Sequence, residues 1–146
     1  MLDVKIKLLR EGAKLPEYKT EGSAALDLSS ASDTPITIPA GGRALIPTGI
    51  AIEPSSSGYV ALVCARSGLA SKHGICLSNG VGVIDSDYRG ELCVPLCNLG
   101  DEEYIVSPYE RIAQMMFLPV EQARLIPTDT LGDTERGSGG FGSTGK

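Results

Sequence analysis

The stretch GICLSNGVGVIDSDYRGEL, residues 74–92, is the part of the sequence around which the fold is organised. Apolar residues alternate with small or polar ones at 75–77 and again at 81–83, which is the period of a β-strand. The dipeptide Asn79-Gly80 stands between the two runs and favours a tight turn between paired strands. The stretch therefore predicts a β-hairpin.

The second arm of this predicted hairpin carries several chemically active side chains. Asp85, Asp87, Tyr88 and Arg89 stand close together, ahead of an apolar strand at 92–96. An acid, an aromatic ring and a base at a strand end are typical of a site. A solvated turn around a buried tyrosine would use the same residues, so periodicity alone leaves both interpretations open.

Short strands separated by turns account for most of the chain, which contains 18 glycines and 9 prolines. Only Ser67 to His73 is predicted to be helical, with Ser67 as N-cap and Gly74 after the last turn. This pattern predicts an all-β fold, an antiparallel sandwich, jelly roll or small barrel. The other predicted strands are residues 4–8 (half-buried), 24–28, 36–38, 43–46, 49–53, 58–65, 104–106 and 112–118.

Composition limits the class of protein. The 146 residues are enough for one domain with its own core, and 42% apolar content is that of a globular protein. The net charge of −5 and the lack of a basic run argue against nucleic acid or an anionic membrane as the main partner. The sequence shows no apolar run typical of a signal peptide or a membrane span, so we expect a cytoplasmic protein.

The four cysteines, Cys64, Cys76, Cys93 and Cys97, all lie in apolar, strand-like contexts. A zinc site needs about four ligands at characteristic spacing, and the single histidine, His73, does not complete one. We therefore expect reduced, buried thiols that pack as small apolar groups.

Two further stretches offer groups that suit an anion. Arg66-Ser67-Gly68, at the predicted helix start, combines N–H groups, a hydroxyl and a guanidinium, although this stretch taken alone favours a capped turn with an exposed arginine. The Gly-rich end of the chain predicts no packed core and would by default be a low-complexity tail. Arg136 and Phe141 would give such a tail a cation for a phosphate and a ring for a base.

Five stretches of the sequence can be taken together: AALDLSSA at 24–31, ARSGLASKHGI at 65–75, NGVGVIDSDYRGEL at 79–92, ERIAQMMF at 110–117 and RGSGGFGSTG at 136–145. In this order they resemble the motifs of the trimeric dUTP pyrophosphatases (dUTPases). The resemblance implies a jelly-roll-like antiparallel β-barrel, a homotrimer with shared sites, and hydrolysis of dUTP to dUMP and pyrophosphate with Mg²⁺. It also implies a barrel domain at 1–135 and a flexible lid at 136–146 that closes over a neighbouring subunit's site.

The same resemblance assigns roles to single residues. Asp85 matches the carboxylate that activates the attacking water, Tyr88 the ring beneath deoxyribose, and Asp27 a supporting acid. No residue matches a direct Mg²⁺ ligand, so the metal is expected to be held by substrate phosphates and water. Uracil and deoxyribose contacts fall on Asn79, Gly82, Val83, Ile84, Tyr88 and Phe141, and phosphate contacts on Arg66, Ser67, Gly68, Gln114, Arg136, Ser138 and Gly139.

Two departures and two rival interpretations accompany the resemblance. Family members often have Gly and an aromatic before the acid of the first motif, where this chain has Ala25-Leu26, and Ala65 replaces a common proline. A dCTP deaminase or bifunctional deaminase-dUTPase would be a longer chain with a glutamate acid/base, and no glutamate here matches it. A catalytically silent nucleotide-binding homologue would be expected to lack Asp85 or the tail.

Overall fold

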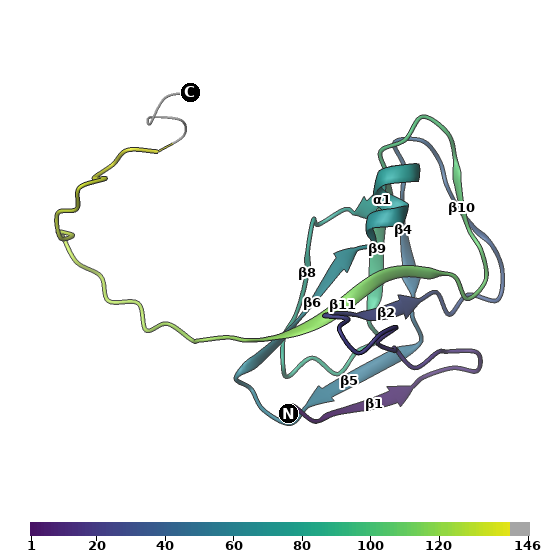
Figure 1. Cartoon of the computed structure of the whole chain (residues 1–146), viewed down its shortest axis with the longest axis horizontal. Helices are drawn as coiled ribbons and strands as arrows, with labels where there is room; N and C mark the ends of the chain where they lie inside the picture. Colours follow the sequence, from purple (N-terminus) through teal and green to yellow (C-terminus); the bar gives the residue numbers. More distant parts are fainter. Residues whose placement is uncertain (141–146) are drawn as a thin grey trace.

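The computed structural model of the protein describes residues 1–140, and these residues form eleven short strands and one helix (Figure 1). The predicted all-β class is confirmed, and the predicted strands coincide with the observed ones to within two residues at each end. The elements are β1 (Val4–Leu8), β2 (Leu26–Ser29), β3 (Ile36–Ile38), β4 (Arg43–Pro47), β5 (Ile50–Pro54), β6 (Tyr59–Ala65), α1 (Ser67–His73), β7 (Ile75–Leu77), β8 (Gly82–Ile84), β9 (Cys93–Asn98), β10 (Tyr104–Val106) and β11 (Arg111–Pro119).

The strands of residues 1–140 form four antiparallel sheets and do not close into one barrel. The largest sheet has the order β2-β11-β6-β8, and the next has the order β4-β9-β7. Two further pairs, β1-β5 and β10-β3, complete the fold. The barrel implied by the resemblance is thus represented by separate sheets that enclose one core.

One hydrophobic core lies between the sheets. The alternation of inward and outward residues is clearest in β9, where Val94 and Leu96 are each 1% exposed while Pro95 between them is half-buried. Asn98, on the same inward face, is fully buried, and its amide donates to the carbonyls of Ile38 and Glu102 at 3.0 and 2.7 Å. Because its donors are satisfied, this polar side chain ties the neighbouring loops together without an unpaired buried group.

The predicted hairpin at 75–84 is not formed, although its turn is. β7 pairs with β9 and β8 pairs with β6, so the two arms belong to different sheets. Gly80 has φ 74°, but Asn79 does not share that left-handed conformation. A two-residue Asn-Gly hairpin that keeps its strands paired needs positive φ at both positions. The turn therefore carries the chain from one sheet to another and leads through β8 to Asp85.

Three smaller expectations also need correction. β1 is not half-buried throughout: beyond Val4 its residues are exposed, with Ile6 at 37% and Leu8 at 47%. The helix has its predicted bounds, but Arg66 occupies the N-cap position in place of Ser67 and makes no side-chain cap hydrogen bond. The four cysteines are free as expected, yet they are half-buried, not buried.

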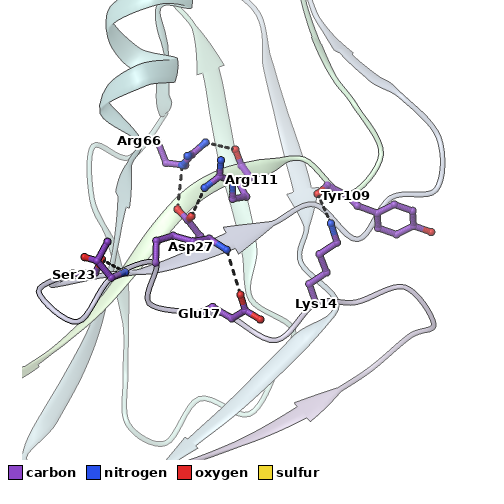
Figure 2. Close-up of polar contacts among 9 residues, drawn as sticks. Lys14, Glu17, Ser23, Asp27, Arg66, Tyr109 and Arg111 are labelled. Atoms are coloured by element: carbon purple, nitrogen blue, oxygen red, sulfur yellow. Dashed lines mark hydrogen bonds and ion pairs between the residues drawn. The ribbon is translucent and has the colours of Figure 1, made fainter.

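A tight turn before β11 packs against the N-terminal loop. Tyr109 has φ 59°, an uncommon value for a bulky residue, and Glu110 closes the turn by donating its N–H to the Ser107 carbonyl at 3.2 Å. Lys14 Nζ donates to the Tyr109 carbonyl at 3.2 Å (Figure 2). The ring lies against Gly12, where a Cβ would be 2.6 Å from Tyr109 Cε1. This contact fixes the point at which the chain enters β11.

The chain leaves the body of the protein after β11 ends at Pro119 (Figure 1). Every residue from 121 to 138 is exposed, and none of them lies in a strand or helix. The longest helix among residues 1–140 is α1, and none there is long and apolar enough to cross a membrane.

Candidate active site

A pocket of about 390 Å³ lies where β2, β11 and the start of α1 meet. Its position follows from strand register, because β11 sets Gln114 opposite Asp27 on β2 and opposite Cys64 near the end of β6. We call it the Asp27 pocket. It is lined by Lys19, Ser23, Ala24, Ala25, Asp27, Arg66, Ser67, Gly68, Arg111, Gln114 and Met116.

One carboxylate organises the Asp27 pocket (Figure 2). Arg66 Nε donates to Asp27 Oδ1 at 3.2 Å, and Arg111 Nη1 donates to Asp27 Oδ2 at 2.8 Å. Arg66 Nη1 also donates to the Arg111 carbonyl at 3.0 Å. The Asp27 side chain is only 15% exposed, so these ion pairs are less screened than surface pairs. Asp27 is thus placed to position Arg66, a geometry that suits the supporting role expected for this acid.

The remaining predicted phosphate residues of the body line the same pocket. Gln114 Nε2 donates to the Ala65 carbonyl at 2.9 Å, which anchors the residue before Arg66. Ser67 and Gly68 are exposed on the first turn of α1, and nothing lies within 4 Å of a Cβ built on Gly68. A ligand can therefore approach the backbone N–H groups here.

A second pocket of about 350 Å³ surrounds Tyr88 and is called the Tyr88 pocket. The Tyr88 hydroxyl donates to the Glu91 carbonyl at 3.1 Å, and a Cβ on Gly90 would lie 2.3 Å from the Tyr88 hydroxyl oxygen. The hydroxyl end of the ring is therefore held by its near neighbours, while the residue stays 46% exposed. The pocket is lined by Leu45, Val83, Ile84, Asp85, Tyr88, Glu91, Leu92 and Cys93.

Asp85 lies at the edge of the Tyr88 pocket, just after β8. Its backbone carbonyl accepts the Tyr88 N–H at 3.1 Å, which sets the acid beside the ring. The residue is exposed, and its carboxylate makes no ion pair or hydrogen bond within residues 1–140. Both carboxylate oxygens are thus free to accept hydrogen bonds from water or a ligand.

Three charged residues that line these pockets, Lys19, Arg111 and Glu91, had no role predicted from the sequence. Arg111 stands in the quoted motif ERIAQMMF, but its contact with Asp27 depends on the pairing of β11 with β2. Glu91 lines the Tyr88 pocket with both oxygens engaged: Arg10 Nη2 lies 2.6 Å from Oε2, and Gly49 N–H donates to Oε1 at 2.8 Å. Glu91 is therefore a structural acid and not a free acid/base.

The structure does not bring all predicted residues into one cavity, since the Asp27 and Tyr88 pockets share no lining residue. Asn79 is exposed at its turn, and Gly82 is buried against Val63, so neither lines the Tyr88 pocket. Residues 136–140 belong to the segment after β11, residues 120–140, which we call the extended segment. There Arg136 Nε donates to the Gly139 carbonyl at 2.9 Å. Ser138 is exposed there, and Phe141 lies outside the described residues.

Comparison with known proteins identifies the fold and then the family. Among solved structures, the fold is that of dUTPases: the dUTPase of Staphylococcus bacteriophage 80alpha with dUPNHPP aligns with a TM-score of 0.89 at 27% identity, covering 99% of each chain. Deoxyuridine 5'-triphosphate nucleotidohydrolases from Burkholderia mallei and Ralstonia pickettii are each 51% identical over 145 residues, 99% of this chain and 98% of theirs. The dUTPase family model matches residues 11–145, and the chain belongs to the dUTPase family.

Proposed function

We propose that the protein hydrolyses dUTP to dUMP and pyrophosphate, which keeps uracil out of DNA and supplies dUMP for thymidylate synthesis. The observation that carries the mechanism is the free Asp85 carboxylate beside the fixed Tyr88 ring in a chain of this family. Asp85 orients a water molecule and accepts its proton as the water oxygen attacks the α-phosphorus. The bond from that phosphorus to the oxygen bridging to the β-phosphorus breaks, and pyrophosphate leaves.

Nucleoside selection is assigned to the Tyr88 pocket and the neighbouring turn. A ring fixed by the Glu91 carbonyl and by Gly90 is a flat support for deoxyribose that leaves no room for a 2′-hydroxyl. Backbone N–H and C=O groups at Gly82, Val83 and Ile84, together with Asn79, are proposed to pair with uracil. Cytosine presents the opposite donor and acceptor on that edge, and would leave buried groups unpaired.

Phosphate binding is assigned to the Asp27 pocket. A guanidinium has five N–H donors. In Arg66, Nε donates to Asp27 and Nη1 donates to the Arg111 carbonyl, so the remaining N–H groups can bind a phosphate. Gln114 likewise keeps a second amide hydrogen. The hydroxyl of Ser67 and the N–H of Gly68 complete the set, while Arg136, Ser138 and Gly139 are proposed to reach the outer phosphates from the tail.

Mg²⁺ is part of the same proposal. Residues 1–140 contain no group of three His, Cys, Asp or Glu side chains that could hold a metal, and both Asp27 oxygens are bound to guanidinium groups. This donor set fits a magnesium ion that takes its oxygens from substrate phosphates and water. Such an ion would offset charge on the triphosphate. A mutant dUTPase of phage phi11, 22% identical and similar in fold, coordinates a structural Mg(II) ion.

We further propose a homotrimer in which each complete site combines different subunits. The two pockets of one chain have separate linings, so a substrate that needs both sets of residues can find them together at a subunit junction. The extended segment carries Leu125, Ile126 and Leu131 at 88%, 74% and 88% exposure, and a neighbouring subunit would cover them. A closed ring of three subunits repeats one such contact three times.

Pyrophosphate release from dUTP with Mg²⁺ tests the function directly. The expected products are dUMP and pyrophosphate, with UTP and dCTP as poor substrates. Ammonia released from dCTP would support a deaminase instead. A protein that binds dUTP but releases neither product would be a silent homologue.

Subunit mixing tests the shared site. Asp85→Asn protein and protein ending at Glu135 are each expected to keep about 1% of the native activity or less. When both are unfolded together and refolded in equal amounts, a site recovers if its Asp85 comes from the truncated chain and its tail from the other. With random assortment, activity returns to about a quarter of the native value. Mixed trimers seen by native mass spectrometry that remain inactive would show that each site is built from one chain.

A further inference from the structure

Two cysteines face each other across β7 and β9, and neither of them lines the Asp27 pocket or the Tyr88 pocket. Cys76 on β7 is the register partner of Cys97 on β9, and their Sγ atoms are 3.4 Å apart. Both thiols are free and half-buried. No role in hydrolysis has been assigned to either residue.

The backbone explains why these two side chains meet. Cys76 stands between buried Ile75 and Leu77, so the alternation of the strand turns it away from the core. Cys97 is placed in the same way on β9. Residues directly opposite on one face of an antiparallel pair are neighbours, so both thiols lie on the outer face of this sheet.

The spacing of the two strands at this point suits a disulfide. Ser78 N–H donates to the Pro95 carbonyl, and Leu99 N–H donates to the Gly74 carbonyl, two residues to either side of the cysteine pair. Hydrogen-bonded pairs alternate along an antiparallel ladder, so Cys76 and Cys97 occupy a hydrogen-bonded pair with Cα atoms about 5.5 Å apart. Disulfides join Cα atoms at roughly 4.4–6.8 Å. The Cα separation is therefore within the range of a disulfide, and the two sulfur atoms, 3.4 Å apart, would come together by side-chain rotation and a small local shift of the strands.

We propose that Cys76 and Cys97 form a reversible disulfide by exchange with a low-molecular-weight disulfide such as oxidised glutathione. The thiolate of one cysteine attacks a glutathione sulfur, forms a mixed disulfide and expels one glutathione thiolate. The thiolate of the second cysteine then attacks the sulfur of the first cysteine in this mixed disulfide and expels the second glutathione thiolate. Two protein thiols lose two electrons and two protons, and one glutathione disulfide becomes two glutathione molecules.

This disulfide would close the loop of residues 77–96, which contains Asp85 and Tyr88. It would link β7 to β9 without contacting either pocket. We therefore expect it to change the stability of the loop and not the reaction of the residues that the loop carries. Burial raises the pKa of the Cys76 thiol, as does its hydrogen bond with Cys97. The thiolate fraction at neutral pH is therefore small, and exchange is expected to be slow in a reducing pool.

Equilibration of the native protein with reduced and oxidised glutathione tests the proposal. After acid quenching and alkylation, peptide mapping is expected to show Cys76 joined to Cys97 and two free thiols per chain, Cys64 and Cys93. Dithiothreitol should restore four. Four free thiols at ratios that oxidise a dithiol peptide, or a bond that uses another cysteine or a second chain, would overturn the proposal.

Variants provide a matched comparison. Protein with Cys64→Ser and Cys93→Ser should form the bond as the native chain does, whereas Cys97→Ser should stop at the mixed disulfide. The oxidised double variant is also expected to unfold at a higher urea concentration than its reduced form, because the closed loop restricts the unfolded chain. An oxidised form that unfolds at the same or a lower urea concentration would show that the native strands do not accommodate the bond, and would contradict the proposal.

Discussion

The Asp27 pocket and the Tyr88 pocket hold their side chains in different ways. In the Asp27 pocket, one carboxylate binds two guanidinium groups that come from distant parts of the chain, Arg66 and Arg111. In the Tyr88 pocket, the ring is held by a near neighbour, since the Tyr88 hydroxyl donates to the Glu91 carbonyl, and the Glu91 carboxylate has distant partners, Arg10 and Gly49. The Asp85 carboxylate has no partner among the described residues.

This difference suggests that residues of the Asp27 pocket contribute to both stability and binding, whereas Asp85 contributes to catalysis alone. Long-range ion pairs hold together the pocket that is proposed to bind phosphate, so a change there should affect both binding and stability. The other pocket contains a turn that leaves the Asp85 carboxylate, the proposed base, without a partner among the described residues. A change at that carboxylate should remove catalysis and leave the fold intact.

Substitution of Asp85 tests this separation with the largest expected effect. Asp85→Asn should lower kcat by roughly 10²–10⁴-fold, because an amide cannot accept the proton of the attacking water. The urea midpoint should not change, since the native carboxylate makes no contact that an amide would lose. Asp87→Asn, two residues away, is the matched control and should keep most of the turnover. Near-normal kcat in Asp85→Asn would remove Asp85 from the mechanism.

Removal of the tail tests whether the two pockets are sufficient for catalysis without the residues that follow Glu135. A chain ending at Glu135 lacks Arg136 and Phe141, and kcat/KM for dUTP should fall by about 10²-fold through lost positioning of the triphosphate. The melting temperature should stay constant, because residues 136–138 are exposed. A truncated protein that unfolds or dissociates would show that the tail is structural.

Tyr88 tests the Tyr88 pocket by selectivity alone. Tyr88→Ala should reduce the preference for dUTP over UTP by about 10-fold, since the support beneath C2′ is removed. Tyr88→Phe keeps the ring and loses only the hydrogen bond to Glu91, so it should retain the preference. The measurement is the ratio of kcat/KM for the two nucleotides. If the ratio stays the same in the alanine variant, another group selects the sugar.

Substitution of Asp27 tests the Asp27 pocket. It has the smallest expected effect on the reaction, together with a measurable effect on the free energy of unfolding. Asp27→Asn weakens two ion pairs, one of them to the half-exposed Arg111, so the free energy of unfolding should fall by about 1 kcal/mol. Arg66 loses its orientation, and KM for dUTP should rise by about 5-fold. Glu17→Gln, which removes an exposed pair with Lys19 beside the same pocket, should change neither quantity. Unchanged KM in Asp27→Asn would separate the carboxylate from substrate binding.

Much of the secondary structure could be predicted because its signals are local. Alternation and Gly/Pro punctuation located β6 and β11 to within two residues. Pairing is not local, and the Asn79-Gly80 signal led to a hairpin whose arms in fact join different sheets. Alternation also distinguishes two faces of a strand without showing what covers them. For this reason β1 was expected to be half-buried, although Ile6 and Leu8 are exposed.

The candidate site shows the same limit. Arg66, Ser67 and Gly68 could be singled out because their donors are consecutive in the sequence, and the structure does place them in one pocket. Arg111 could not be assigned, because its partner Asp27 comes beside it only through the register of β11 and β2. Glu91 was passed over for a related reason, since its partners Arg10 and Gly49 lie on another part of the chain.

The contact between Gly12 and Tyr109 has a consequence for how this sequence can evolve. A Cβ at position 12 would meet the Tyr109 ring at 2.6 Å, and Gly12 itself has φ 80°, which a side chain would strain. A replacement of Gly12 should therefore be harmful while the ring is present and much less so after position 109 has become small. The two positions should be epistatic, with the order of mutation deciding which lineages survive. Tyr109 lies two residues before Arg111, which lines the Asp27 pocket. Amino-acid changes in the N-terminal loop are therefore restricted by the need to keep that pocket intact.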